Sequence, residues 1–390
     1  MRRNLEEDLH RIMRNAIDSN QIMGMNILIE RDDGELLYCQ EGLADREKGT
    51  EIDQNTIFRL YSMTKPITAA AVMLLMERGE LDLCTPVGDI LPSYRELTVV
   101  KDGEIVPCER PILVQDLLRM TSGLVYGDTV TIPGKATEGM FTELQMRIRT
   151  DDPMTTRELA DRLSDCPLAF EPGSGWRYGS SADVLGAVIE AVSNMPFGEF
   201  LDRELFEPLN MEDTAFWVPE DKQERLAATY RTVSPDEEME RFTETHLGIT
   251  ADVSAYPAFE SGGAGLCSTL LDYRSFARML LQGGRFGGRQ ILRRETVEYM
   301  TKPLLMPLQQ KAFDLDAIAL GGYSYGNLMR VCTDPRQTGY FARKGEYGWD
   351  GWLGTYFANF PKEHMTILMG MQKVDAGTFD LTRKLRNVIL

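Results

Sequence analysis

A serine and a lysine three residues apart open the most apolar helix that the sequence predicts. Ser62 and Lys65 fall in residues 58–81, FRLYSMTKPITAAAVMLLMERGEL, and no other serine in the chain has a lysine three positions later. On a helix such residues are neighbours on one face. A lysine at the mouth of an apolar helix is poorly solvated as an ammonium, which favours the free amine that a base requires. The pair therefore predicts a nucleophile beside its base; a helix cap beside a surface lysine is the alternative.

A tyrosine in a glycine-rich loop is the second candidate for chemistry. Tyr178 stands in LAFEPGSGWRYGSSADVLGAVIE, directly before an apolar helical pattern. A phenol on such a loop can reach a cleft and exchange a proton with a nearby lysine. The alternative is an aromatic residue that packs beside Trp176. A literal Tyr-x-Asn match, Tyr325 to Asn327, falls in a predicted late strand and is expected to be core or sheet edge.

Glycines beside a predicted strand form the third stretch. Gly348, Gly351 and Gly354 occur in KGEYGWDGWLGTYFANFP. Glycine lets a ligand approach the backbone closely, and an N–H at the edge of that strand could donate to an oxyanion. A glycine-rich turn that only feeds the strand is the alternative.

The composition narrows the class of protein. The 390 residues are 43% hydrophobic and 26% charged, which is typical of a globular chain with room for two lobes. The net charge of -18, without a basic tract, argues against nucleic acid and anionic membrane surfaces as partners. Six cysteines without a C-x-x-C pair and three scattered histidines predict reduced thiols and no metal site. No motif indicates a cofactor, so none is expected.

The order of the predicted elements favours a sheet built from both ends of the chain. Residues 5–17 follow an amphipathic helical pattern, and two β-prone runs flank the turn Asp32-Asp33-Gly34. The apolar helix ends near Gly79, a plausible C-cap. β character returns in YSYGNLMRV, GTYFANF and MTILMGMQ, and residues 377–390 close the chain as a helix.

These elements predict an α/β (α+β) fold, an antiparallel sheet flanked by helices. The sheet domain is expected from residues 1–81 and 257–390, residues 82–256 form an inserted, mainly helical lobe, and the active site lies between them. The N-terminal stretch MRRNLEEDLHRIMRNAIDSNQ has no apolar run behind its arginines, unlike a secretory signal. We expect a cytoplasmic protein without a membrane span; the oligomeric state is left open.

Taken together, the three stretches resemble the three motifs of serine β-lactamases and penicillin-binding proteins. Ser62-Met63-Thr64-Lys65, Tyr178-Gly179-Ser180 and Trp349-Asp350-Gly351 stand in the order of those motifs. The likeness is closer to the esterase and transesterase branch related to class C β-lactamases, the family VIII carboxylesterases. The accessory stretches LLRMTSGL, FEPGSGWRYGS, GGAGLCSTLLD and GTYFANFPKE agree, so the resemblance covers roughly residues 5–388.

The resemblance implies a β-lactamase/transpeptidase-like fold and an acyl-enzyme mechanism. In that family the serine is acylated, a lysine and a tyrosine handle its proton, and two backbone N–H groups form the oxyanion hole. By position these would be Ser62, Lys65, Tyr178, and the N–H groups of Ser62 and Trp352. The expected substrate-binding residues are Tyr126, Trp176, Ser180, Trp349, Asp350 and Gly351.

The third motif departs from the family pattern. Lys-Thr-Gly or His-Thr-Gly is usual, whereas Trp349-Asp350-Gly351 lacks the cation that would hold the carboxylate of a β-lactam or a peptide C-terminus. An acid at this place would repel such a carboxylate, and the tryptophan favours uncharged esters. Arg343 or Lys344 could replace the missing cation. In the second motif, Ser180 stands where asparagine is usual, which weakens a side-chain contact to the substrate.

The leading prediction is a serine hydrolase, a carboxylesterase or transesterase acting on an uncharged small-molecule ester or amide with weak or no β-lactamase activity. A β-lactamase or D-Ala peptidase is the alternative within the family. A catalytically silent relative that binds peptidoglycan fragments, peptides or a partner is the alternative of another class, although it would not need Ser62, Lys65 and Tyr178 together. A Ser-His-Asp hydrolase is disfavoured because each histidine has an ordinary structural explanation: His10 lies in the first predicted helix, His246 in a polar loop and His364 in a turn. In GSGWRYG a tyrosine replaces the last glycine of a dinucleotide site.

Overall fold

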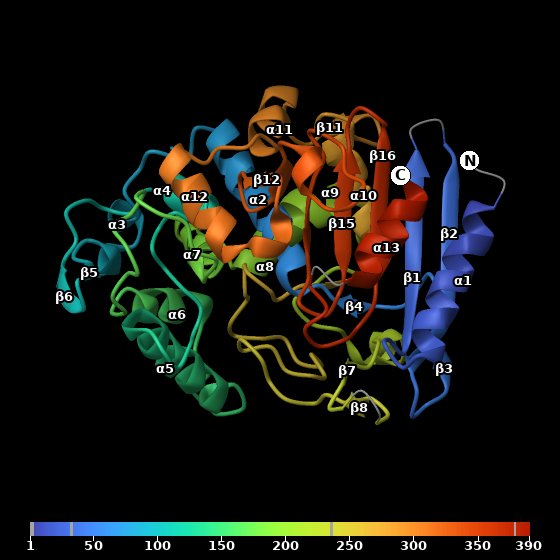
Figure 1. The fold of residues 1–390 in the computed structure, drawn as a ribbon. Coiled ribbons are helices and arrows are strands. Elements are labelled where there is room, and N and C mark those ends of the chain that lie inside the picture. Colours follow the sequence, from blue (N-terminus) through green and yellow to red (C-terminus); the bar gives the residue numbers. More distant parts are fainter. Residues whose placement is uncertain (1–3, 32–33, 235–236, 378–379) are drawn as a thin grey trace.

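An antiparallel sheet built from both ends of the chain is the frame of the molecule (Figure 1). The computed structural model describes residues 4–31, 34–234, 237–377 and 380–390, and in these ranges the sheet has eight strands in the order β12-β13-β14-β15-β16-β1-β2-β3. They are β1 (Gly24–Arg31), β2 (Leu36–Asp45), β3 (Thr50–Glu51), β12 (Tyr323–Tyr325), β13 (Arg330–Cys332), β14 (Tyr347–Asp350), β15 (Tyr356–Phe360) and β16 (Met365–Gly370). Because β1 pairs with β16, the first and last strands of the sequence meet inside the sheet.

Different cores cover the two faces of the sheet. Ile27 and Ile29 of β1 pack with α1 (Leu5–Asp18) and α13 (Asp380–Ile389), whereas Leu28 packs into the main core. Successive side chains of a strand point to opposite faces, so a strand buried on both faces is apolar throughout. The two terminal helices lie together beside the sheet (Figure 1). The predicted amphipathic stripe of α1 is confirmed, with these residues buried: Leu5, Leu9, Met13 and Ala16.

The helix after Ser62 lies at the centre of the molecule. α2 (Thr64–Glu77) is buried along most of its length and contacts α7 (Ser181–Ser193), α11 (Arg294–Met300) and β14. It ends beside Gly79 as predicted, where a φ of +71° places the glycine in the left-handed region. Since protein cores are close-packed, a helix enclosed in this way holds its first residues firmly in place.

The middle of the chain is mainly helical, with short strand pairs. Its helices are α3 (Val87–Ile90), α4 (Val114–Leu118), α5 (Ile132–Arg147), α6 (Thr156–Leu163), α7, α8 (Phe197–Leu201), the π-helical η3 (Asp202–Phe206) and α9 (Glu207–Leu209), followed later by α10 (Leu270–Leu281), α11 and α12 (Pro307–Asp316). The short pairs are β5 with β6 (Thr98–Lys101, Glu104–Pro107), β7 with β8 (Tyr230–Arg231, Glu240–Arg241), β10 with β11 (Arg285–Phe286, Arg289–Gln290) and β4 with β9 (Phe58–Arg59, Cys267–Ser268). The division into parts at residues 81/82 and 256/257 stays a prediction.

The predicted β elements are partly confirmed. β1 and β2 form the expected hairpin, whose turn residues Asp32 and Asp33 lie outside the described residues. GTYFANF and MTILMGMQ supply β15 and β16. The single strand predicted at YSYGNLMRV is wrong, because the chain turns between β12 and β13: Gly326 N–H bonds to Met329 O at 2.9 Å, and Leu328 has a φ of +57°. The β5–β6 hairpin had no counterpart in the expected pattern.

Within the described ranges, no single helix has the length and apolar character to cross a membrane. In those ranges, one pair of consecutive helical segments, residues 181–193 and 197–209, is long and apolar enough only when the two are taken together, and the pair is bent by 78° where the segments meet.

Candidate active site

Ser62 lies in η1 (Tyr61–Met63), a tight 3₁₀ turn that leads into α2. The turn is held from two sides, because Leu60 N–H bonds to Leu266 O at 2.8 Å and Leu60 O accepts from Thr355 Oγ1 at 3.0 Å. Tyr61 has a φ of +45°, in the left-handed region that costs a non-glycine residue about 1–3 kcal/mol. Such a conformation persists only where the surroundings enforce it, so the serine is rigidly placed.

The side chain of Lys65 connects Ser62 to two distant parts of the chain. Its Nζ lies 3.2 Å from Ser62 Oγ, 3.0 Å from Tyr126 OH and 2.8 Å from Gly263 O. Lys65 is fully buried, so these three oxygens take the place of water around the amine. The contact between Ser62 and Lys65 that their spacing predicted is present in the structure.

A buried carboxylate supports Lys65 from behind. Asp183, in the first turn of α7, accepts hydrogen bonds from Gly263 N–H at 3.1 Å and from Ser261 Oγ at 2.5 Å. It thereby holds the turn whose carbonyl contacts Lys65. Burial raises the pKa of Asp183, while the Ser261 hydrogen bond and the charge of Lys65 act in the opposite direction. Sequence reasoning missed this residue; its only signal was a carboxylate inside the otherwise apolar helix pattern SADVLGAVIE.

Two tyrosines flank Lys65 in different ways. Tyr126 contributes its hydroxyl, and burial raises the pKa of this phenol well above its ordinary value. Tyr178 instead turns its ring to the lysine, with Nζ 4.6 Å from the ring centroid. The Tyr178 oxygen accepts a 2.9 Å hydrogen bond from Trp349 Nε1, which leaves its own proton for a group in the cleft. The sequence singled out Tyr178 for proton transfer and Tyr126 only as a pocket wall; the structure brings both beside the lysine.

A cleft of about 470 Å³ opens beside Ser62. Its lining consists of Ser62, Trp176, Tyr178, residues 316–320, residues 349–352 and Gly377. Trp176 and Trp349 are only 3% and 8% exposed, and each meets the buried Tyr325 edge-on, at centroid distances of 5.3 and 5.2 Å. The cleft wall is therefore a packed aromatic block with well-defined geometry. Tyr325, the literal Tyr-x-Asn match, belongs to the core as expected.

The turn after β14 carries Trp352, one of the two expected oxyanion donors. Gly351 brings this turn against the serine turn, because a Cβ there would stand 2.3 Å from Leu60 O. In the part of the chain that the structure describes, no backbone carbonyl accepts a hydrogen bond from Trp352 N–H. The pairing of this N–H with that of Ser62 as an oxyanion hole stays a prediction.

An aromatic stack links the two turns. His246 stacks on the indole of Trp352, with 3.9 Å between the ring centroids and 26° between the planes, and Tyr61 lies 5.0 Å from the same indole. Trp352 Nε1 also donates to Asp375 Oδ1 at 2.7 Å. Burial lowers the pKa of His246. The sequence placed His246 in a polar loop without a role, since nothing local indicates which distant ring it meets.

The acid of the third motif is paired. Asp350 Oδ1 lies 2.7 Å from Arg330 Nη1, and the side chains are 11% and 3% exposed. A paired carboxylate repels a substrate carboxylate less than the free one that the sequence suggested. The replacement cations considered from the sequence lie elsewhere: Arg343 bonds to Leu390 O, and neither it nor Lys344 lines the cleft.

Ser180 is not among the residues that line the cleft. It is fully buried, and its Oγ donates to Val125 O at 3.2 Å. The hydroxyl therefore supports the loop that carries Tyr126, and we do not include Ser180 in the proposed substrate contacts.

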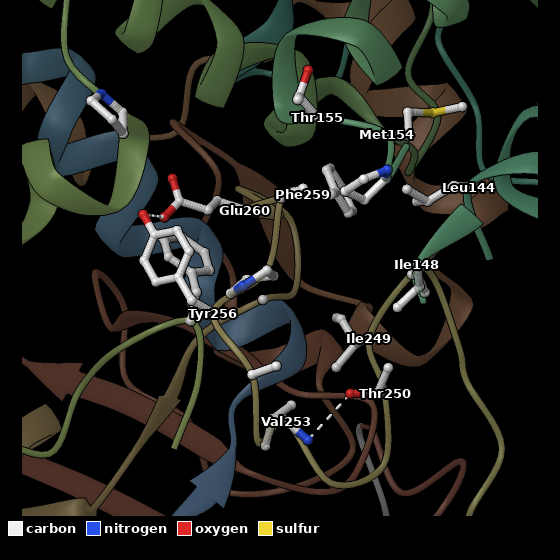
Figure 2. Close-up of a pocket in the computed structure, with 18 of the residues that line it drawn as sticks. Leu144, Ile148, Met154, Thr155, Ile249, Thr250, Val253, Tyr256, Phe259 and Glu260 are labelled. Atoms are coloured by element: carbon white, nitrogen blue, oxygen red, sulfur yellow. Dashed lines mark hydrogen bonds between the residues drawn. The ribbon is translucent and has the colours of Figure 1, made fainter. Parts of the chain in front are cut away.

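A larger cavity, of about 1050 Å³, borders the segment that contacts Lys65 (Figure 2). Figure 2 shows Tyr256 pointing to Glu260, to which its hydroxyl donates at 2.7 Å. Neither Ser62 nor Lys65 lines this cavity, so it is separate from the cleft. Among the described residues, no three or more His, Cys, Asp and Glu side chains are placed to hold a metal ion.

The protein-family model described as Beta-lactamase matches residues 9–388. The chain belongs to the β-lactamase family. The resemblance drawn from the three motifs is thereby confirmed, and this β-lactamase-family member is a serine hydrolase with the β-lactamase/transpeptidase-like fold.

Relatives of this family member include a named esterase. Esterase EstB of Burkholderia gladioli is 30% identical over 387 residues, which cover 96% of this chain and 92% of EstB. Protein Rv1367c of Mycobacterium tuberculosis is 30% identical over 368 residues, covering 92% and 88% of the two chains. The structure of EstCE1, described as a hydrolase with promiscuous acyltransferase activity, superposes with a TM-score of 0.82 over 99% of this chain and 98% of EstCE1. At 24% identity this last likeness shows the fold.

Proposed function

We propose that this β-lactamase-family protein is a carboxylesterase, or an acyl-transferring esterase, that works through an acyl-enzyme on Ser62. One observation carries the proposal: Lys65 Nζ contacts both Ser62 Oγ, at 3.2 Å, and Tyr126 OH, at 3.0 Å. A hydroxyl beside a buried amine is the arrangement that activates a serine nucleophile. A protein that only binds its ligand has no use for it.

In the proposed reaction, Ser62 Oγ bonds to the ester carbonyl carbon while its proton passes to Lys65 Nζ. The carbonyl oxygen becomes an oxyanion, which the N–H groups of Ser62 and Trp352 stabilise; one such donor is typically worth about 3 kcal/mol. The bond to the leaving alkoxide then breaks. Tyr178 gives that alkoxide a proton from the cleft side and recovers one from Lys65. Water or another alcohol releases the acyl group by the same steps in reverse.

The cleft favours an uncharged ester. Its wall is aromatic, and each of its two acids is paired with an arginine: Asp350 with Arg330 and Asp316 with Arg177. The described residues of the cleft lining therefore offer no free cation to a substrate carboxylate. EstB is named an esterase, and EstCE1 is described as a hydrolase with promiscuous acyltransferase activity; both descriptions support an ester as the substrate.

Hydrolysis of a lactam or a D-Ala peptide is the second candidate, and the position of Arg330 favours it. This guanidinium stands directly behind Asp350, a residue of the cleft lining. Because Asp350 neutralises it, we expect such activity to be weak.

Labelling with a fluorophosphonate tests the proposal. The probe should add one adduct, located on Ser62, and the adduct should be absent in Ser62→Ala. Ser19→Ala removes an exposed serine at the end of α1 and is the matched control that should label like the wild type. A folded wild type that neither labels nor turns over esters would favour the silent, ligand-binding alternative instead.

A further inference from the structure

A polar cavity of about 540 Å³ lies next to Arg59, three residues before Ser62. None of its lining residues lines the Ser62 cleft. Its wall comes from the end of β2 and the turn after it, from Arg59 and Arg149, from residues 223–229 and from residues 241–252. The polar side chains of the lining are unusually rich in cations and hydroxyls: Lys48, Arg59, Arg149 and Arg241, then Thr229, Thr243, Thr245 and Thr250, with Gln223, Asp45 and Asp252.

Arg59 is a buried cation without a counter-ion. It is 5% exposed, and in the described part of the chain no carboxylate oxygen lies within 4.0 Å of its guanidinium. Its Nη atoms donate to Ala227 O and Gln372 Oε1, at 2.7 and 3.3 Å, and to Ala251 O. A guanidinium has five N–H groups, so these three bonds leave two, and Nε has no partner at all. Burying such a charge unpaired is costly.

The neighbouring charged side chains do not supply a counter-ion for Arg59. Arg241 and Lys48 share one carboxylate, Asp45, at 3.2 and 3.9 Å, and Arg241 reaches Glu47 at 3.4 Å. Burial lowers the pKa of Arg59; the charge of Asp252 acts in the opposite direction, and Arg241 adds a smaller lowering effect.

Two exposed groups complete the cavity. Arg149 and Asp252 pair with each other at 3.1 Å. The lining thus holds four cations and two carboxylates, an excess of two positive charges (4 − 2), in a chain whose net charge is -18. A local positive site on an acidic protein attracts a small anion, while the overall negative charge repels a large polyanion.

We propose that this cavity is a binding site for a small oxyanion, a phosphate or polycarboxylate group, held by Arg59 and by the threonine hydroxyls. Charge-assisted hydrogen bonds from a guanidinium to a planar or tetrahedral oxyanion are among the strongest in proteins. The site goes beyond the proposed esterase function, whose chemistry at Ser62 requires no anion. Residues 241–252 also carry His246, which stacks on Trp352, so a segment that lines the cavity contacts a residue that lines the cleft.

Binding of inorganic phosphate and of citrate tests this site, measured by titration calorimetry on the full chain at constant ionic strength adjusted with sodium chloride. Constant ionic strength removes general screening from the comparison. The wild type should bind at least one of the two anions saturably at one site, and its Tm should rise with the concentration of that anion. Binding of phosphate but not citrate would identify a phosphate group as the ligand. Binding of citrate but not phosphate would identify a polycarboxylate.

Variants locate the binding. Arg59→Gln should abolish it, and the rim changes Lys48→Gln and Arg149→Gln should each weaken it about fivefold, since each removes one nearby charge. Lys48 and Arg149 are 58% and 75% exposed, so both variants should fold even if Arg59→Gln does not. Arg336→Gln, which removes an 88% exposed charge outside the lining, is the control and should bind like the wild type. No saturable binding of either anion, or wild-type affinity in both rim variants, would overturn the proposal.

Discussion

The indole N–H of Trp349 donates a 2.9 Å hydrogen bond to the phenol oxygen of Tyr178. The bond joins the second motif to the third across the cleft beside Ser62. It helps to hold Tyr178, whose ring faces Lys65 and which lines the cleft. It also stabilises the charge that the phenol oxygen would carry after giving up its proton. Trp349, the tryptophan of the third motif, thus positions Tyr178, the proposed proton carrier, in addition to its expected effect on substrate choice.

Replacing Trp349 with phenylalanine should lower kcat about tenfold, because a hydrogen bond to a group that becomes charged is typically worth about 1.5–3 kcal/mol. The aromatic wall should be kept, and fluorophosphonate labelling of Ser62 should persist. Trp217→Phe, outside the cleft lining, is the matched control. Ester hydrolysis at the wild-type kcat in Trp349→Phe would show that the bond has no part in turnover.

The two tyrosines beside Lys65 should contribute unequally. Tyr178→Phe should lower kcat about a hundredfold or more, since positioned proton transfer usually contributes 10²–10⁴. Tyr126→Phe should cost less, about tenfold, because Lys65 keeps its contacts with Ser62 and Gly263. Steady-state kinetics on one ester, with Tyr256→Phe as a control, measure the kcat of each variant. A larger loss of kcat in Tyr126→Phe than in Tyr178→Phe would make Tyr126 the main proton carrier instead.

Substrate preference follows from the charge balance of the cleft. Short p-nitrophenyl esters should have a kcat/KM about a hundredfold above that of nitrocefin, because the Asp350–Arg330 pair leaves no free cation for the carboxylate of the lactam. Comparable values for the two substrates would refute the assignment to uncharged esters.

Asp350→Asn should shift that preference. The change leaves the guanidinium of Arg330 without its counter-charge beside the cleft. We expect the ratio of kcat/KM for an ester bearing a distal carboxylate to that of its uncharged analogue to rise about tenfold, while the free energy of unfolding falls by about 3–5 kcal/mol. Asp334→Asn, which breaks an exposed pair with Arg336, should change neither quantity. If the ratio of kcat/KM values were unchanged in folded Asp350→Asn, the charge of Arg330 would have no effect on substrate binding in the cleft.

His246 should make stability depend on pH. Burial lowers its pKa in the folded chain below the ordinary 6.5, so the unfolded chain binds its proton more readily. The free energy of unfolding should therefore fall as the pH drops below about 6.5, whereas above that value the imidazole is neutral in both states and adds no slope. In His246→Phe the ring stack is retained without the titrating group. Its Tm should fall less than that of the wild type between about pH 7.5 and pH 5.5, and an equal fall in both proteins would contradict this.

Several helices and strands could be predicted from the sequence because they depend on the local pattern of apolar, polar and turn-forming residues. The β1–β2 hairpin, the stripe of α1 and the stop at Gly79 follow from a turn signal between two β-prone runs, from the helical period and from the conformation of glycine. The turn between β12 and β13 was missed because Leu328 adopts a positive φ, which an apolar residue seldom signals. Ser180 shows the reverse case, since its place in the motif suggested a substrate contact, whereas its hydroxyl is buried against Val125 O and it does not line the cleft.

The sequence by itself determined that Ser62 and Lys65 meet, since residues three apart at the start of a helix share a face whatever surrounds them. It also determined the family, through the order of the three motifs. Only the tertiary structure decided which groups complete the site: Tyr126 on Lys65, Trp349 on Tyr178, His246 on Trp352 and Arg330 on Asp350. These partners come from elements far apart in the chain. Their contacts depend on how the sheet and helices pack, which no local spacing encodes.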